Sequence, residues 1–132
     1  MSQQDVDTIK GAYDAFARQD VDAVMAAFDD SIDWDVPDSV PWGGHYQGKQ
    51  EVGGFFAKLP EYVDELHVDP QDYIDAGDRV VATGRHHGNI GGEPFETRFA
   101  MVWTMSGGKA VKFKEYSDMT PLAKLYDAKV AA

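Results

Sequence analysis

The chain has 132 residues, a length typical of one domain, so we expect a single domain over residues 1–132. Its 12 Lys and Arg against 23 Asp and Glu give a net charge of −11 at pH 7. This acidity argues against binding to nucleic acid or to anionic membrane surfaces, because both depend on basic side chains that neutralise phosphates.

Cysteine is absent, which excludes disulfides, thiolate catalysis and cysteine-based zinc sites. The N-terminal residues MSQQDVDTIK lack the basic region and apolar stretch of a signal peptide. No apolar run reaches the roughly 20 residues that a membrane-spanning helix needs. We therefore expect a cytoplasmic protein that does not bind membranes.

Apolar residues at three- and four-residue spacing predict a first helix: Val6, Ile9, Tyr13 and Phe16. Asp20 is typical of an N-cap residue and predicts a second, short helix directly after it.

A third helix is predicted from Val52 to Leu59, where we expect Pro60 to end it. A closing helix is predicted near the C-terminus, with Thr120 as its N-cap and Pro121 as its first residue.

Ile32, Trp34 and Val36 alternate with polar residues and predict a short strand. Residues 37–48 are rich in Pro and Gly, so we expect a loop there. Beyond residue 62, β-type runs separated by glycine turns predict four more strands. This order predicts an α+β fold in which three N-terminal helices cover one face of a curved antiparallel or mixed sheet. We expect a hydrophobic pocket between the two layers.

Four strings of the sequence, in this order, resemble the SnoaL-like proteins of the ketosteroid-isomerase-like, nuclear-transport-factor-2-like superfamily. They are YDAFARQDVDAVMAAFDDSIDWDVP, GHYQGKQEVGGFF, DAGDRVVATGR and FAMVWTMSGGKAVKFKEYSDM, and together they span nearly the whole chain. The resemblance implies a cone-shaped α+β fold with a pocket in the cone. It also implies a homodimer formed through the outer face of the sheet.

The resemblance carries only part of the ketosteroid isomerase site. In ketosteroid isomerases a general-base aspartate follows the first strand, and the matching position here falls near Val36, with Asp35 and Asp38 as neighbours. The acid that completes the oxyanion hole of those enzymes would fall near Ala100. Only their oxyanion tyrosine has a counterpart, close to Tyr13. Ketosteroid isomerisation by the usual residues is therefore not expected.

The resemblance to SnoaL-like cyclases implies a catalytic aspartate late in the last strand, which Asp118 matches. The histidine often found on the preceding strand is replaced by Met101. Asp118 is the predicted general base, and a desolvated carboxylate could take a proton from an activated carbon. Its alternative role is to cap the closing helix or to face solvent.

Three further residues are candidates for catalysis. Arg85 could clamp an enolate or carboxylate, or pair with Glu115 or Glu96 to hold adjacent strands. His86 could carry protons, with His87 on the opposite face of the strand. Tyr13 could donate a hydrogen bond to a substrate carbonyl.

On strict alternation Glu115 faces the opposite way from Asp118, although a β-bulge near the end of the strand could turn it toward the site. The alternative, which we favour, is an exposed, salt-bridged outer face together with Lys112 and Lys114.

No histidine pair has metal-ligand spacing, and no motif places His45 or His67, so we expect no metal and no cofactor.

The predicted substrate-binding residues are mostly aromatic, as befits a hydrophobic pocket. They are Trp34, Trp42, Tyr46, Phe56, Met101, Trp103 and Tyr116.

Two functions remain open at this point. The first is a cofactor-independent cyclase or isomerase that acts on a small hydrophobic carbonyl compound. The second is a dimeric domain that binds a small molecule without chemistry. Epoxide hydrolysis would need a cluster of Asp, Arg, Asn and Tyr, and Asn89 is the only asparagine in the chain.

Overall fold

The computed structural model describes residues 2–132 and confirms an α+β fold. The helices are α1 (Ser2–Ala17), α2 (Val21–Met25), α3 (Gly48–Tyr62) and α4 (Thr120–Ala131). The strands are β1 (Phe28–Val36), β2 (Gly44–Gln47), β3 (Glu65–Asp75), β4 (Arg79–Ile90), β5 (Glu93–Ser106) and β6 (Lys109–Ser117).

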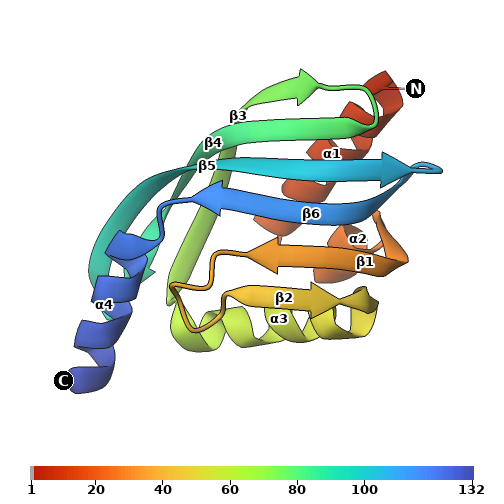
Figure 1. Cartoon of the computed structure of the whole chain (residues 1–132). Helices are drawn as coiled ribbons and strands as arrows, with labels where there is room; N and C mark the ends of the chain where they lie inside the picture. Colours follow the sequence, from red (N-terminus) through yellow and green to blue (C-terminus); the bar gives the residue numbers. More distant parts are fainter. Residues whose placement is uncertain (1) are drawn as a thin grey trace.

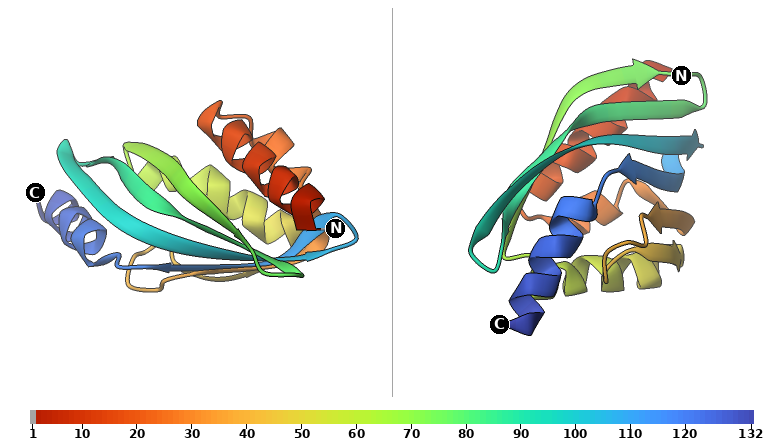
Figure 2. Two further views of the ribbon diagram at one scale, coloured as in Figure 1. Left: turned by 90° about the horizontal axis from the view of Figure 1, so that it is seen from above. Right: turned by 60° about the vertical axis from the view of Figure 1, so that its left-hand side comes forward.

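The six strands form one mixed sheet in the order β2-β1-β6-β5-β4-β3 (Figure 1). β1 pairs with β6 in parallel, and the other neighbouring pairs are antiparallel. The sheet curves strongly, with α1 and α3 against one face and α4 at one end (Figure 2). The cone that the resemblance implies is therefore an open, curved sheet, with β2 and β3 as its edges.

The curvature depends on a close approach between β3 and β4. The pairing register shifts between Pro70 and Asp72, as at a β-bulge, which bends a strand. Gly84 faces this segment, and a Cβ on Gly84 would lie 2.1 Å from the carbonyl oxygen of Asp69. Only glycine leaves room for the two backbones at this position.

The hairpin between β5 and β6 fixes which side chains face inward. Its turn contains Gly107 and Gly108, and the register shifts once between Thr104 and Met105. Beyond the shift, Trp103 lies opposite Phe113 and Met101 lies opposite Glu115, all four buried. Side chains alternate between the two faces of a strand, so Glu115 shares the inner face with Phe113.

The sequence predictions of local structure differ from the fold at three places. Residues 44–47 form β2 rather than a loop, because β1 offers them an open edge to pair with. α3 continues past Pro60 to Tyr62, since a proline near the end of a helix removes only one donor. The N-cap of α4 is Met119 rather than the predicted Thr120, which is the first residue of the helix.

The predicted cap of α2 is confirmed, because the Asp20 carboxylate accepts a hydrogen bond of 3.1 Å from the backbone N–H of Ala23. No helix among residues 2–132 is both long and apolar enough to cross a membrane.

Replacing Gly84 with alanine is expected to destabilise the fold by about 3 kcal/mol, because the new methyl group would meet the β3 backbone. Gly54→Ala in α3 is the matched control, since no other atom lies within 4 Å of its added Cβ. Removing a glycine from a helix should stabilise the fold by up to about 1 kcal/mol. Urea unfolding of both variants checks the pair, and equal stabilities would contradict this account of the curvature.

Candidate active site

A cavity of about 90 Å³ lies between the inner face of the sheet and the helices. Every strand except β2 contributes to its wall, as do all four helices. Most of the lining is apolar, and aromatic rings form much of it. These are Tyr13, Phe16, Trp34, Trp42, Phe55, Phe56, Trp103 and Phe113.

One acidic side chain lines this apolar cavity, namely Glu115 of β6. It is only 8% exposed, and its partner His86, on β4, is 3% exposed. His86 Nε2 lies 3.2 Å from Glu115 Oε2, and the Ser117 hydroxyl donates to the same oxygen at 2.7 Å. These two contacts offset the cost of taking a carboxylate out of water.

Two buried nitrogen atoms in the same wall have no hydrogen-bond partner among the described residues. They are His86 Nδ1 and Trp34 Nε1. Buried polar groups are nearly always paired, so such atoms mark positions where a ligand atom would be stabilised. A cavity whose wall contains an unpaired indole N–H and an unpaired imidazole nitrogen suits a ligand with oxygen atoms.

Tyr13 supplies a hydrogen-bond donor to the cavity. Trp103 Nε1 donates to the Tyr13 hydroxyl at 3.0 Å, and that hydroxyl donates to Met101 Sδ at 3.0 Å. Burial raises the pKa of Tyr13 well above its ordinary value, with a further contribution from the charge of Glu115, so the hydroxyl keeps its proton. A thioether is a weak acceptor, and a substrate carbonyl oxygen would accept this hydrogen bond better.

Asp118, the predicted general base, lies outside the cavity. It is exposed, and its carboxylate accepts a hydrogen bond of 3.0 Å from the backbone N–H of Thr120 at the start of α4. Hydrogen bonds from the Thr120 side chain and backbone lower the pKa of Asp118. The structure therefore agrees with the alternative that Asp118 faces solvent, and its carboxylate is hydrogen-bonded to the first residue of α4.

Arg85 also lies away from the cavity, on the outer face of β4. It forms ion pairs with Asp69 of β3 and Glu96 of β5, at 3.4 and 3.0 Å. These contacts hold neighbouring strands together, which is the structural role that the sequence offered for Arg85 as an alternative to clamping a substrate. His87 is on the same outer face and stacks on His67 at 4.9 Å between ring centroids.

The predicted substrate-binding residues divide into two groups. Five of them line the cavity: Trp34, Trp42, Phe56, Met101 and Trp103. Tyr46 packs on Phe55 and donates from its hydroxyl to the Trp42 carbonyl oxygen at 2.7 Å. Tyr116 is 54% exposed on the outer face of β6, beneath the Lys114 ammonium group.

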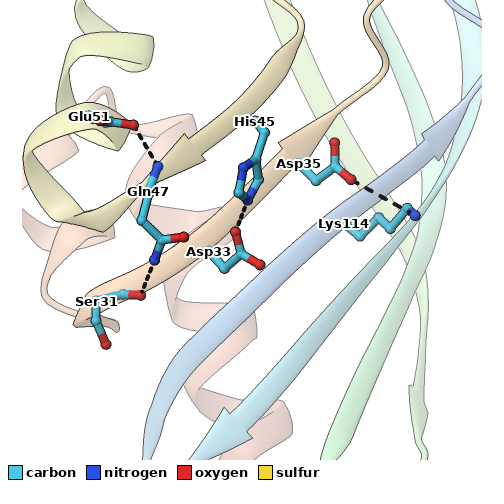
Figure 3. Close-up of polar contacts among 7 residues, drawn as sticks. All are labelled: Ser31, Asp33, Asp35, His45, Gln47, Glu51 and Lys114. Carbon is cyan, nitrogen blue, oxygen red and sulfur yellow. Dashed lines mark hydrogen bonds and ion pairs between the residues drawn. The ribbon is translucent and has the colours of Figure 1, made fainter.

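The acids of the DWDVPD segment do not reach the cavity either. Asp35 points to the outer face, where it pairs with Lys114 at 3.9 Å, and Asp33 contacts His45 beside it (Figure 3). Val36 does line the cavity, so an apolar side chain occupies the position that corresponds to the isomerase base.

Glu115 is the residue for which the sequence prediction was wrong. We expected it on the outer face with Lys112 and Lys114, but it is buried in the cavity wall. The alternation of β6 could have placed it, because Glu115 lies two residues from Phe113, an aromatic residue typical of a core.

The comparisons with known proteins agree with this fold. A model of the SnoaL-like domain matches residues 9–113. The chain belongs to the SnoaL-like family. Glu115 lies two residues beyond the matched segment, whereas Tyr13, His86 and Met101 lie within it. No curated protein matches the chain.

Solved structures show a likeness of fold over almost the whole chain. An NTF2-like protein of unknown function from Burkholderia pseudomallei shares 28% identity, with a TM-score of 0.89 over 93% of this chain and 97% of that one. An NTF2-like protein from Burkholderia thailandensis shares 29% identity, with a TM-score of 0.83 over 96% of each chain. A protein from Jannaschia sp. described as a SnoaL-like polyketide cyclase shares 16% identity, with a TM-score of 0.82 over 96% of this chain and 94% of that one.

No group of three or more His, Cys, Asp or Glu side chains within residues 2–132 is arranged to hold a metal ion.

The buried Tyr13 of this SnoaL-like protein should make stability depend on alkaline pH. The unfolded chain releases the Tyr13 proton near pH 10, whereas the folded chain retains it. Its contribution is thus complete below about pH 10 and is lost as the pH rises above it, by up to about 1.4 kcal/mol per pH unit. Urea unfolding from about pH 9 to 11 should therefore show a shallower loss in Tyr13→Phe than in the wild type. The exposed Tyr116→Phe is the control, and equal slopes in wild type and Tyr13→Phe would contradict the prediction.

Proposed function

We propose that this protein is a cofactor-independent enzyme that performs acid–base chemistry on a small hydrophobic carbonyl compound. Glu115 takes a proton from the carbon next to the carbonyl, the electron pair of the broken C–H bond forms a C=C double bond, and the π pair of the carbonyl moves to its oxygen. Tyr13 donates a hydrogen bond to the resulting enolate oxygen. The proton then returns from Glu115 to the product, so that isomerisation or ring closure needs no other reactant.

The observation that carries this proposal is a carboxylate in an apolar cavity whose wall also contains a protonated tyrosine. Glu115 is near enough to Tyr13 for its charge to contribute to the raised pKa of the hydroxyl. A base and an oxyanion donor in one water-poor space are the two groups that enolate chemistry requires. His86 is then a positioning residue, because its contact with Oε2 orients the Glu115 carboxylate.

Membership in the SnoaL-like family is consistent with this activity but supports it only at the level of the fold. The Jannaschia protein is described as a polyketide cyclase, and ring closure of a polyketide begins with an enolate beside a carbonyl.

A binding domain without chemistry is the second candidate function. It is favoured by the fact that His86 and Ser117 already satisfy one oxygen of Glu115. A buried ion pair or hydrogen-bonded cluster can serve structure alone. In that case the cavity would hold a hydrophobic ligand, and Glu115 would not exchange protons with it.

We also propose that two copies of the chain associate through the outer face of the sheet. The registers of β3 to β6 bring five mostly apolar side chains together on this face: Ile74, Val81, Ala100, Val102 and Tyr116. Ile74 and Tyr116 are 46% and 54% exposed. Contiguous apolar surface of this kind is uncommon on proteins that remain monomeric.

The catalytic role of Glu115 predicts proton exchange with a simple ketone. In D₂O, the protein should accelerate the loss of the C1 protons of 2-tetralone, measured by ¹H NMR. Glu115→Gln keeps the shape of the side chain but removes the base, and it should lower this acceleration by about 100-fold or more. Asp118→Asn is the matched control and should retain it, because Asp118 lies outside the cavity. Equal exchange rates in wild type and Glu115→Gln would contradict the mechanism, and ligand binding without exchange would support the binding domain.

If two copies associate through the outer face of the sheet, a charge placed on that face should lower the mass of the particle in solution. Val102→Lys should convert a dimer into a monomer in size-exclusion chromatography with light scattering, because the lysine would be buried against its partner. Ala57→Lys, on the exposed side of α3, adds the same charge elsewhere and should leave the mass unchanged. A monomeric wild type at micromolar concentration would contradict the proposal.

A further inference from the structure

A second hollow lies beside the cavity, and we call it the outer groove. It runs between the end of α1, the start of α2, the end of α3 and the start of β3, with a volume of about 460 Å³. Five residues line both spaces: Phe16, Phe56, Leu59, Val63 and Leu66. These five side chains, which we call the partition, form a wall that the cavity and the groove share.

The cavity alone is too small for an aromatic substrate. Its volume of about 90 Å³ is below the roughly 150 Å³ of an engineered cavity that holds one benzene ring. Binding sites for small molecules commonly have volumes of about 300–1,000 Å³. The outer groove lies within that range, so a ligand larger than about one aromatic ring that reaches Glu115 would need room beyond the cavity, and the groove offers that room.

The partition is built so that side-chain rotation can open it. The Phe16 ring, from α1, and the Phe56 ring, from α3, meet at 6.0 Å between centroids, and both side chains are only partly buried. Neither ring can form a conventional hydrogen bond, so packing alone holds them in place. Both spaces would join if these two rings turned aside.

The charges around both spaces disfavour an anion. Among residues 2–132, neither the cavity nor the groove is lined by a lysine or an arginine. Glu115 lines the cavity, and Asp64 and Glu65 line the groove. Hydrogen bonds from Lys129 and from the backbone of Gly91 lower the pKa of Asp64, so it remains ionised. Lys129 is thereby engaged with Asp64 outside the groove lining.

We propose that the cavity and the outer groove form one two-chamber site for an uncharged, elongated aromatic ketone. The carbonyl end of the ligand occupies the cavity beside Glu115 and Tyr13, and its second ring occupies the groove. Phe16 and Phe56 move aside to admit it. This inference rests on the proposed function for the orientation of the ligand, and it adds the class of substrate and its route.

Two ligands of one shape test the charge preference. 4-Acetylbiphenyl is neutral, and biphenyl-4-carboxylate carries a negative charge at the same end of the molecule. Calorimetry should show the carboxylate binding at least about tenfold more weakly, since it would enter beside buried or ionised carboxylates. ¹³C-methyl-methionine NMR should show the ketone shifting the signals of Met101 and Met119, because both line the cavity and not the groove.

The partition predicts a change in binding rate. Phe56→Ala removes part of the partition, and it should speed association of 4-acetylbiphenyl about tenfold, as expected where a moving side chain limits entry. Phe95→Ala is the matched control, since Phe95 is only 6% exposed but lines neither the cavity nor the groove. Stopped-flow tryptophan fluorescence follows the rate, because all three tryptophans line the cavity.

Three results would overturn the inference. They are equal affinity for the ketone and the carboxylate, ketone binding that leaves the Met101 and Met119 signals unmoved, and equal association rates in Phe56→Ala and Phe95→Ala. None of these measurements depends on turnover. If the ketone binds as expected while Glu115→Gln and wild type exchange protons equally, the two-chamber site stands and the proposed chemistry fails.

Discussion

The contact between the Glu115 carboxylate and the His86 imidazole is the interaction around which the interior is organised. An unpaired carboxylate in so apolar a space would be very costly, and this one is tolerated because His86 and Ser117 reach the same oxygen. The contact spans β5, since Glu115 and His86 belong to the strands on either side of it. The His86 ring lies over Phe99 of that middle strand, at 4.9 Å between centroids. The buried charged group and its two partners therefore gather on strands β4 and β6.

Aromatic packing gives the remainder of the interior its shape. The Trp34 ring stacks on Phe113 at 3.9 Å and contacts Phe55 and Phe56 of α3 at 5.7 and 5.5 Å. These contacts link two strands to the covering helix through large, rigid side chains. At the end of the sheet near α4, the rings of Trp42, Tyr62 and Tyr126 close together in the same way. Aromatic rings therefore form much of the cavity wall.

Much of this architecture could be predicted from the sequence, because periodicity reports which side chains are buried. The spacing of Tyr13 and Phe16 and the alternation of Trp34 and Val36 placed these residues on inward faces, and all four line the cavity. β2 was not predictable from its own residues, since it is a strand only because β1 leaves an edge free.

The buried carboxylate of the cavity, Glu115, was harder to identify from sequence. A resemblance drew attention to Asp118, whereas strand alternation counted from Phe113 would have indicated Glu115. A charged residue on an inward face conflicts with the usual preference for burying apolar side chains, so composition alone assigns it to the surface. The partners that make its burial possible, His86 and Ser117, come together only through the pairing of β4, β5 and β6.

The register shift in the hairpin between β5 and β6 links a surface turn to the sign of charge inside the protein. Lys114, Glu115 and Tyr116 are consecutive, and alternation decides which of them faces inward. A slip of β6 by one residue against β5 would replace the acidic group of the cavity with a lysine or a tyrosine. Insertion or deletion of one residue near Gly107 and Gly108 is thus an evolutionary route by which this scaffold could exchange the carboxylate of its cavity for an amine or a phenol. Such a step would change the chemistry without altering any residue of the cavity wall in the other strands.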